Sequence, residues 1–122
     1  MIKGTGVDII EISRIEKAVK SRERFASRIF TAGELGYCLA RKPRWSSLAA
    51  RFAAKEAVSK ALGTGFGRVK WTDIEVVNDP GGKPEIRLHG AAQQVAGELG
   101  ISKMALSLSH CHEYAVAFVV AY

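Results

Sequence analysis

The stretch RFAAKEAVSKALGTGFG, residues 51–67, decides the fold, because it holds the end of the clearest helix in the chain and the loop that follows. The alanine-rich run over residues 46–62 contains no glycine or proline, which predicts a helix. Ser46 or Ser47 can cap its N-terminus, and Gly63 supplies the stop. The GTGFG loop follows a helix instead of a strand, so it is interpreted as a helix exit with open backbone amides, and not as a Rossmann phosphate loop.

This helix has a polar side, because successive residues are rotated by about 100°. One side carries Phe52, Glu56, Ser59 and Lys60. The other side carries Ala50, Ala54, Val58 and Ala61. The polar side offers a carboxylate, a hydroxyl and an ammonium beside an aromatic ring. The structural alternative is an exposed Glu56–Lys60 ion pair worth about 0.3–0.5 kcal/mol.

Before and after this helix in the chain, alternating or continuous apolar runs predict strands at residues 2–10, 72–77, 85–89, 103–109 and 114–121. Helical periodicity predicts further helices at residues 11–28, 32–41 and 90–99. Thr31 is the expected N-cap of the second of these, with Glu34 at the capping-box position. Turns are expected at 78–84 and 110–113. The order β-α-α-α-β-β-α-β-β predicts a single α+β domain over residues 1–122, with an antiparallel sheet packed against helices.

The chain is basic, with 18 Lys and Arg against 12 Asp and Glu and a net charge of +6 over 122 residues. This excess favours an anionic partner: nucleic acid, an acidic protein, a phosphorylated ligand or a membrane surface. No segment approaches the roughly 20 apolar residues of a membrane span, and the first residues do not form a signal peptide. Cys38 and Cys111 fit no metal or CxxC spacing, so reduced thiols in a cytoplasmic protein are expected.

Asp8 is an unusual residue, because aspartate is a poor strand former and here it lies between Val7 and Ile9. Gly4 and Gly6 share its face of the strand and are expected to leave open space beside it. A partly buried carboxylate requires a charge partner or a metal ion. The alternative is an aspartate that caps the helix beginning near Glu11.

A basic face is expected on the helix over residues 11–28. If this helix is continuous, four cations lie within an arc of about 80°: Arg14, Lys17, Arg24 and Arg28. Phe25 lies at the edge of the arc as an exposed aromatic ring, which suits an acidic protein partner. A solvated basic face is the alternative, and no known nucleic-acid signature is present.

Taken together, these segments resemble the short bacterial 4′-phosphopantetheinyl transferases, the holo-acyl-carrier-protein synthase family. The resemblance covers the whole chain in order. The matching segments are GVDIIEISRI (6–15), FTAGE (30–34), RFAAKEAVSKALGTG (51–65), GGKP (81–84) and SLSH (107–110).

The resemblance implies transfer of the phosphopantetheine arm of coenzyme A to a serine of apo-acyl carrier protein, with release of adenosine 3′,5′-bisphosphate. It places Mg²⁺ on Asp8 and Glu56, which suits the oxygen ligands that Mg²⁺ prefers. Lys60 lies one turn beyond Glu56, where its ammonium can hold phosphates. Glu56 is the candidate for accepting the serine proton, either directly or through a metal-bound water.

The resemblance also implies coenzyme A contacts at Ser59, Gly63, Gly65, Lys42, Arg44, Lys83, Pro84 and His110. It implies homotrimers with sites between neighbouring subunits and a role in lipid metabolism, through carrier proteins of fatty acid or polyketide synthesis. Nucleic acid and membrane partners are not expected. Two alternatives predict different sequence features. A non-enzymatic nucleic-acid-binding module explains the charge but not Asp8. An inactive relative that only binds carrier proteins would lack the two carboxylates.

Overall fold

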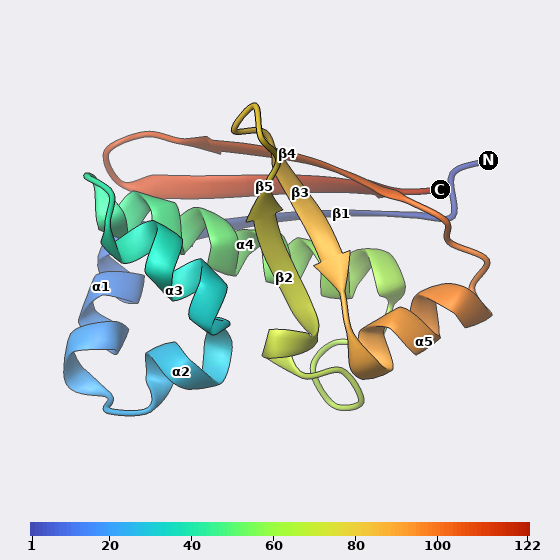
Figure 1. The fold of residues 1–122 in the computed structure, drawn as a ribbon, viewed down its shortest axis with the longest axis horizontal. Helices are drawn as coiled ribbons and strands as arrows, with labels where there is room; N and C mark the ends of the chain where they lie inside the picture. Colours follow the sequence, from blue (N-terminus) through green and yellow to red (C-terminus); the bar gives the residue numbers. More distant parts are fainter.

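The computed structural model describes residues 1–122 and confirms an α+β fold with antiparallel strands. The strands are β1 (Gly4–Glu11), β2 (Ile74–Asn78), β3 (Pro84–Leu88), β4 (Met104–His110) and β5 (Tyr114–Ala121). The helices are α1 (Ile12–Ser21), α2 (Phe25–Ile29), α3 (Ala32–Leu39), α4 (Arg44–Leu62) and α5 (Gly90–Glu98), with a 3₁₀ turn at Trp71–Asp73. Three strands form a sheet in the order β1-β5-β4, and β2 and β3 form a separate hairpin (Figure 1).

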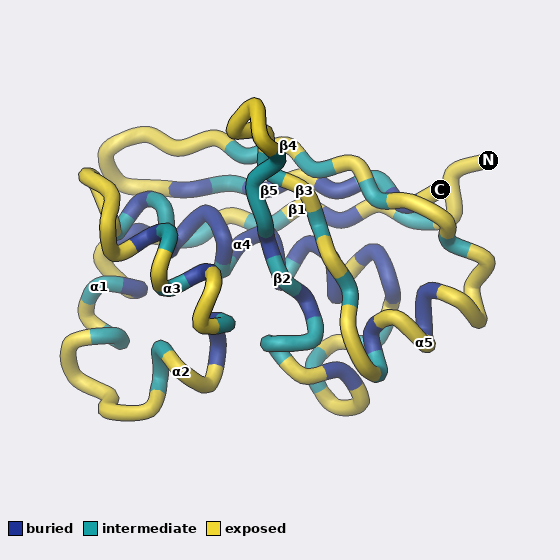
Figure 2. Tube along the Cα trace, in the orientation of Figure 1, coloured by how far each residue is buried: buried dark blue, intermediate teal, exposed yellow.

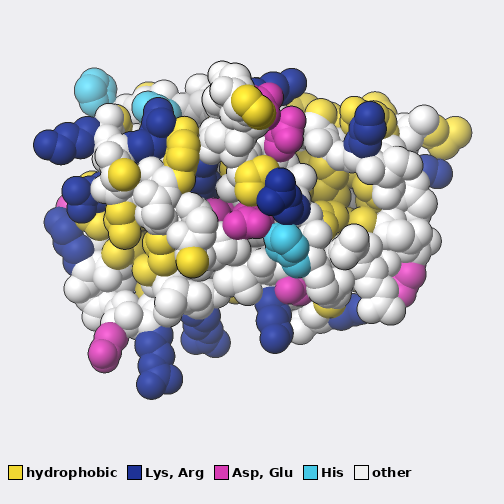
Figure 3. Space-filling model, viewed as in Figure 1, with side chains coloured by type: hydrophobic (Ala, Val, Ile, Leu, Met, Phe, Trp, Pro, Cys, Tyr) yellow, Lys and Arg dark blue, Asp and Glu magenta, His cyan; other side chains and the backbone are white.

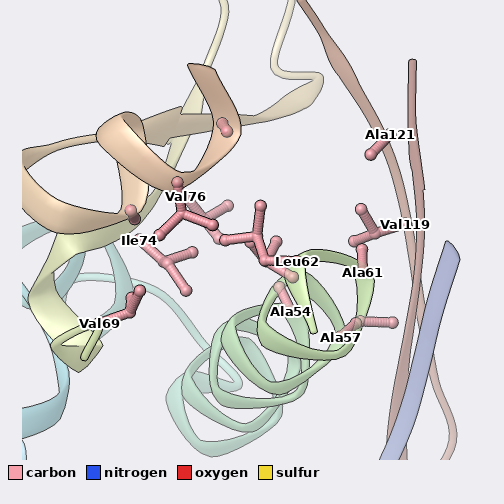
Figure 4. Close-up of a cluster of buried hydrophobic side chains, with 14 of the residues drawn as sticks. Ala54, Ala57, Ala61, Leu62, Val69, Ile74, Val76, Val119 and Ala121 are labelled. Carbon is pink, nitrogen blue, oxygen red and sulfur yellow. The ribbon is translucent and has the colours of Figure 1, made fainter. Parts of the chain in front are cut away.

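Helix α4 is the central element, since it packs against strands of both sheets. Small side chains of α4 meet the hairpin on one side and β5 on the other (Figure 4). Buried residues are concentrated along α4, whereas the corner formed by α1 and α2 is largely exposed (Figure 2). Burial of this alanine-rich helix therefore sets where its polar residues emerge.

Strand β1 lies directly on the backbone of α4. A Cβ atom at Gly6 would be 1.8 Å from the carbonyl oxygen of Ala57, and one at Gly4 would be 2.4 Å from that of Ala61. Only glycine allows such an approach. The prediction of open space beside Asp8 is therefore wrong, because helix α4 fills it.

The predicted helix over residues 11–28 is interrupted, which adds one helix to the expected order. Helix α1 ends at Ser21, Arg22 is extended, and α2 begins at Phe25. Residues 20–24 are all polar, so no side chain anchors another turn of α1 in the core. The chain returns to the core at Ile29 and Phe30, which are both buried.

Helix ends follow the sequence signals in two of three cases. The capping box is confirmed: Glu34 N–H donates to Thr31 Oγ1 at 3.1 Å, and Thr31 N–H donates to Glu34 Oε1 at 2.9 Å. Gly63 ends α4 with a left-handed φ of 74°. The serine cap is wrong, because α4 begins at Arg44 after Pro43 and Ser46 lies inside its first turn.

A fully buried ion pair fixes α4 against α3 and β2. Lys55 Nζ lies 2.8 Å from Glu34 Oε1 and donates to the carbonyl oxygens of Trp71 and Ile74. Glu34 Oε2 accepts the Val76 N–H at 2.8 Å. Burial lowers the pKa of Lys55, and the Glu34 carboxylate opposes that shift. This ion pair fixes the rotation of α4 about its axis. It therefore also fixes the direction of Glu56, which is the next residue of the helix.

Candidate active site

Asp8 and Lys60 meet at the edge of the sheet, where β1 crosses α4. Lys60 Nζ lies 3.0 Å from Asp8 Oδ1 and donates to the carbonyl oxygen of Val7 at 2.9 Å. The Asp8 side chain is 17% exposed, so its charge is held close to the protein surface. It does not cap α1, because the N-cap residue is Glu11 and no side chain caps that end. Asp8 therefore has the charge partner that its position in a strand requires.

Glu56 belongs to the same charge cluster. Burial raises the pKa of the Glu56 carboxyl above its usual value, the neighbouring Asp8 raises it further, and Lys60 opposes both. The like charge of Asp8 can act in this way only from nearby. The tertiary structure therefore brings Asp8, Glu56 and Lys60 together.

The titration of Glu56 provides a test of this geometry. We expect the Asp8→Asn variant to lower the pKa of Glu56 and the Lys60→Met variant to raise it, because each change removes one neighbouring charge. The measurement is the carboxyl ¹³C shift of Glu56 against pH in metal-free protein, assigned with Glu56→Gln. A Glu56 titration that is the same in wild type and both variants would contradict the proximity of the three side chains.

Ser59 and the glycine loop lie next to this cluster in the chain. The Ser59 hydroxyl is buried and donates to the Glu56 carbonyl oxygen at 2.8 Å, so it does not open onto the polar side of α4 as expected. The carbonyl oxygen of Ser59 accepts the Gly63 N–H at 2.9 Å and the Thr64 N–H at 3.2 Å. Gly63 and Gly65 both adopt positive φ, and both are exposed. The loop therefore leaves α4 one turn beyond Lys60.

A second site lies at the opposite edge of the sheet, because β1 and β4 are the two outer strands. It is a pocket of about 190 Å³ between α3, α4 and the end of β4. Its polar lining is Tyr37, Arg41, Lys42, Ser46, Ser47, Arg51 and His110. The structure thus brings together Lys42 and His110, which the sequence analysis expected near coenzyme A.

Arg51 dominates this pocket, and sequence reasoning missed it. Its guanidinium is buried, lies 4.5 Å from the ring of Tyr37 and donates to Asn78 Oδ1 at 2.6 Å. Its Nε has no hydrogen-bond partner within the protein. The contacts with Tyr37 and Asn78 fix the guanidinium in the wall of the pocket. The position of Arg51 at the start of the RFAAKE stretch was the available signal.

Other predicted coenzyme A contacts lie apart from this pocket. Arg44 is exposed and does not line it. Lys83 and Pro84 line a separate cavity of about 760 Å³ between β3, α5 and β4. The turn that precedes them still touches the Arg51 pocket, since Asn78 binds Arg51.

The predicted basic surface is present in altered form. Figure 3 shows Lys and Arg side chains projecting at the edge formed by α1 and α2. All four predicted cations are exposed: Arg14, Lys17, Arg24 and Arg28. They do not share one arc, because α1 and α2 are separate helices. Phe25 is half-buried and stacks on Phe52 with ring centroids 6.4 Å apart, so it is not the freely exposed ring that was expected.

Only two carboxylates are available as metal ligands in the cluster. Residues 1–122 contain no group of three or more His, Cys, Asp or Glu side chains placed to hold a metal ion. Mg²⁺ commonly takes one or two carboxylates from a protein and completes its shell with phosphate oxygens and water. Asp8 and Glu56 therefore fit Mg²⁺ and do not fit a structural zinc site.

The comparisons with known proteins agree with this geometry. Residues 4–119 match the 4′-phosphopantetheinyl transferase superfamily. A holo-[acyl-carrier-protein] synthase of Moorella thermoacetica is 56% identical over 112 residues, which cover 92% of this chain and 88% of the relative.

Solved structures show the same fold. The holo-[acyl-carrier-protein] synthase of Neisseria meningitidis superposes with a TM-score of 0.90 at 41% identity, over 100% of this chain and 99% of its own. The holo-(acyl-carrier-protein) synthase of Bacillus anthracis in complex with CoA (3′,5′-ADP) gives 0.82 at 43% identity, over 99% and 96%. The chain therefore belongs to the 4′-phosphopantetheinyl transferase superfamily.

Proposed function

We propose that this chain, as one domain over residues 1–122, transfers 4′-phosphopantetheine from coenzyme A to a serine of an apo-acyl carrier protein. The observation that carries the proposal is the meeting of Asp8, Glu56 and Lys60 where β1 crosses α4. Two carboxylates and an ammonium at one point suit a pyrophosphate with a bound cation. The named relatives support the same activity.

The chemistry follows from the charges of the cluster. The serine Oγ attacks the phosphorus that bears the pantetheine, a new P–O bond forms, and the bond to the adenosine-side phosphate breaks. Glu56 accepts the serine proton as the general base of the cluster. Lys60 donates to the phosphates. When bound to Asp8 and Glu56, Mg²⁺ supplies positive charge that neutralises the pyrophosphate oxygens. The other product is adenosine 3′,5′-bisphosphate.

We propose that the Arg51 pocket holds the nucleotide end of coenzyme A. Arg41, Lys42 and Arg51 all line the pocket, and three cations near one another suit a phosphate monoester. The ring of Tyr37 and the side chain of His110 line the same pocket and suit an adenine base.

The Arg51→Met variant tests this assignment. We expect its dissociation constant for coenzyme A to rise about 10- to 100-fold, because hydrogen bonds to charged groups contribute roughly 1.5–3 kcal/mol. Calorimetric titration with coenzyme A measures the change. Arg22→Met is the matched control, since Arg22 is exposed and lies outside the pocket. Equal affinities in the two variants would refute the assignment.

We propose further that the active form is a homotrimer with sites between subunits. The two halves of the site lie at opposite edges of the β1-β5-β4 sheet, so a neighbouring subunit can bring one half to the other. The outer face of this sheet is apolar and exposed at Val7, Ile9 and Phe118, with Val7 opposite Phe118 in the register. Contiguous exposed apolar residues on a soluble domain indicate an interface.

Assembly is tested by the Phe118→Glu variant. We expect it to sediment as a monomer and to lose transfer, because a charge on the apolar face cannot be desolvated in an interface. Leu99→Glu is the control, since Leu99 is an exposed apolar residue outside the sheet. Analytical ultracentrifugation compares the two. A trimeric Phe118→Glu protein would rule out this face as the interface.

We propose that the acyl carrier protein docks on the corner formed by α1 and α2. Arg14, Lys17, Arg24 and Arg28 project there, so an acidic partner would find complementary charge. None of the helices of this protein is long and apolar enough to cross a membrane. Cys38 and Cys111 are both free thiols, and we place the reaction in the cytoplasm.

The transfer itself is tested with coenzyme A, MgCl₂ and several apo-carrier proteins, followed by mass spectrometry of the carrier. The expected result is a carrier heavier by one phosphopantetheine group, and no product when EDTA replaces MgCl₂. No added mass on any carrier, with protein that is folded by circular dichroism, would refute the proposed function. Salt-sensitive binding of nucleic acid in its place would favour the non-enzymatic alternative.

A further inference from the structure

Four aromatic rings form a continuous stack beside the candidate active site. Phe66 lies almost flat on Trp71, with ring centroids 3.6 Å apart and planes 7° apart. Trp71 stacks on Phe52 at 4.9 Å, and Phe52 on Phe25 at 6.4 Å. All four side chains are half-buried. Phe52 lies one turn before Glu56 on α4, so the stack meets this helix one turn from the carboxylate.

The stack reaches the loop between α4 and the 3₁₀ turn, whose glycine-rich part has no other apolar side chain. Residues 63–70 leave the end of α4 and run back along it, because the carbonyl oxygen of Trp71 accepts from Lys55 near the middle of the helix. The backbone N–H groups of residues 65–69 donate no hydrogen bond within the protein. A Cβ atom at Gly63, Gly65 or Gly67 would meet nothing within 4 Å. Two apolar side chains attach the loop: Val69 is fully buried in the core, and Phe66, which stacks on Trp71, holds the glycine-rich part before it.

The loop also lies close in the chain to the charged residues of the candidate site. It begins one turn beyond Lys60, and its unpaired N–H groups are donors that suit phosphate oxygens. A segment with three glycines in five residues has many conformations when it is unattached, and ordering it on ligand binding reduces affinity. A ring stacked on Trp71 restricts those conformations before the ligand arrives.

We infer that Phe66 and Trp71 are positioning residues that hold the loop of residues 63–70 in the conformation that receives the phosphates of coenzyme A. The inference rests on the proposed function. Neither ring touches the reacting atoms; Phe66 acts through the backbone of the loop, and Trp71 is the surface against which Phe66 packs. The two rings affect the affinity for coenzyme A. They do not affect the affinity for the carrier protein or the rate of the chemical step.

The experiment compares steady-state kinetics of wild type, Phe66→Leu and Phe66→Tyr. In Phe66→Leu we expect the KM for coenzyme A to rise about tenfold, the upper end of what one aromatic pair contributes. The KM for the carrier protein and kcat at saturating coenzyme A stay within about twofold. Phe66→Tyr restores the stack and the wild-type KM. Arg68→Gln is the control within the loop, since Arg68 forms only an exposed ion pair with Glu98.

A second measurement does not depend on activity. The chain has two tryptophans, so Trp45→Phe leaves Trp71 as the single reporter. In ligand-free protein, adding Phe66→Leu to this background shifts the Trp71 fluorescence to longer wavelength, because the indole ring becomes more exposed to water. Adding Phe66→Tyr leaves the emission wavelength unchanged.

The outcomes separate the two proposals. A wild type without transfer would refute the proposed function. Transfer by wild type with an unchanged KM for coenzyme A in Phe66→Leu would refute this inference alone. Equal changes in kcat and in both KM values would also refute it, because they indicate a general loss of structure.

Discussion

Transfer should fall by about 10²- to 10⁴-fold in the Glu56→Gln variant, the range expected when a general base is removed. Glutamine keeps the shape of the side chain but neither accepts the serine proton nor contributes a carboxylate to Mg²⁺. Asp8→Asn is expected to lose a comparable factor, because only one carboxylate then remains. Single-turnover transfer to apo-carrier protein, followed by mass spectrometry, measures both.

The fold of these variants should be unaffected. Glu56 is destabilised as an anion by burial and by Asp8, so its neutral replacement relieves repulsion. Glu16→Gln is the matched control, since Glu16 pairs with Lys20 on the exposed surface of α1 and lies outside the cluster. Full activity in both Glu56→Gln and Asp8→Asn would remove the proposed metal and base site.

The Gly6→Ala variant is expected to lose about 3 kcal/mol or more of folding free energy. The added methyl group would lie 1.8 Å from the backbone oxygen of Ala57, so β1 must separate from α4. No side-chain rotation relieves this contact, because the position of a Cβ atom is fixed by its backbone and the Ala57 oxygen belongs to the main chain. Thermal unfolding should show a midpoint lower by about 10 °C. Any folded fraction should transfer poorly, since moving β1 draws Asp8 away from Glu56.

Gly36→Ala is the control for this variant. Gly36 lies within α3, and a Cβ atom there would meet nothing within 4 Å. Alanine in a helix interior is expected to stabilise the protein by about 0.5–1 kcal/mol. Gly6→Ala with wild-type stability would show that β1 and α4 are not in direct backbone contact.

The sequence predicted the local features of this protein well. The Thr31–Glu34 capping box and the exit of α4 at Gly63 depend on residues a few positions apart, so the local pattern contains the information. Resemblance to a family then led to Asp8, Glu56 and Lys60, three residues that the structure brings together.

Long-range packing decided what the sequence could not. The interruption between α1 and α2 depends on where the core lies, because residues 20–24 have nothing apolar to bury. Ser59 has the spacing of a polar-face residue, yet its environment comes from the elements packed around α4, and it is buried. Arg51 likewise resembles a surface cation in the sequence, whereas Tyr37 and Asn78 enclose it.

By itself, the sequence of this protein determined most of its helices and strands, because periodicity and caps act over short distances along the chain. Its resemblance to a family indicated Asp8, Glu56 and Lys60 as the candidate site. Only the tertiary structure decided that Asp8 reaches Glu56, since two glycines must lie on the backbone of a helix about 50 residues away in the chain. It also decided that the Arg51 pocket lies at the other edge of the sheet, because strand order is set by pairing across the fold and not by neighbours in sequence.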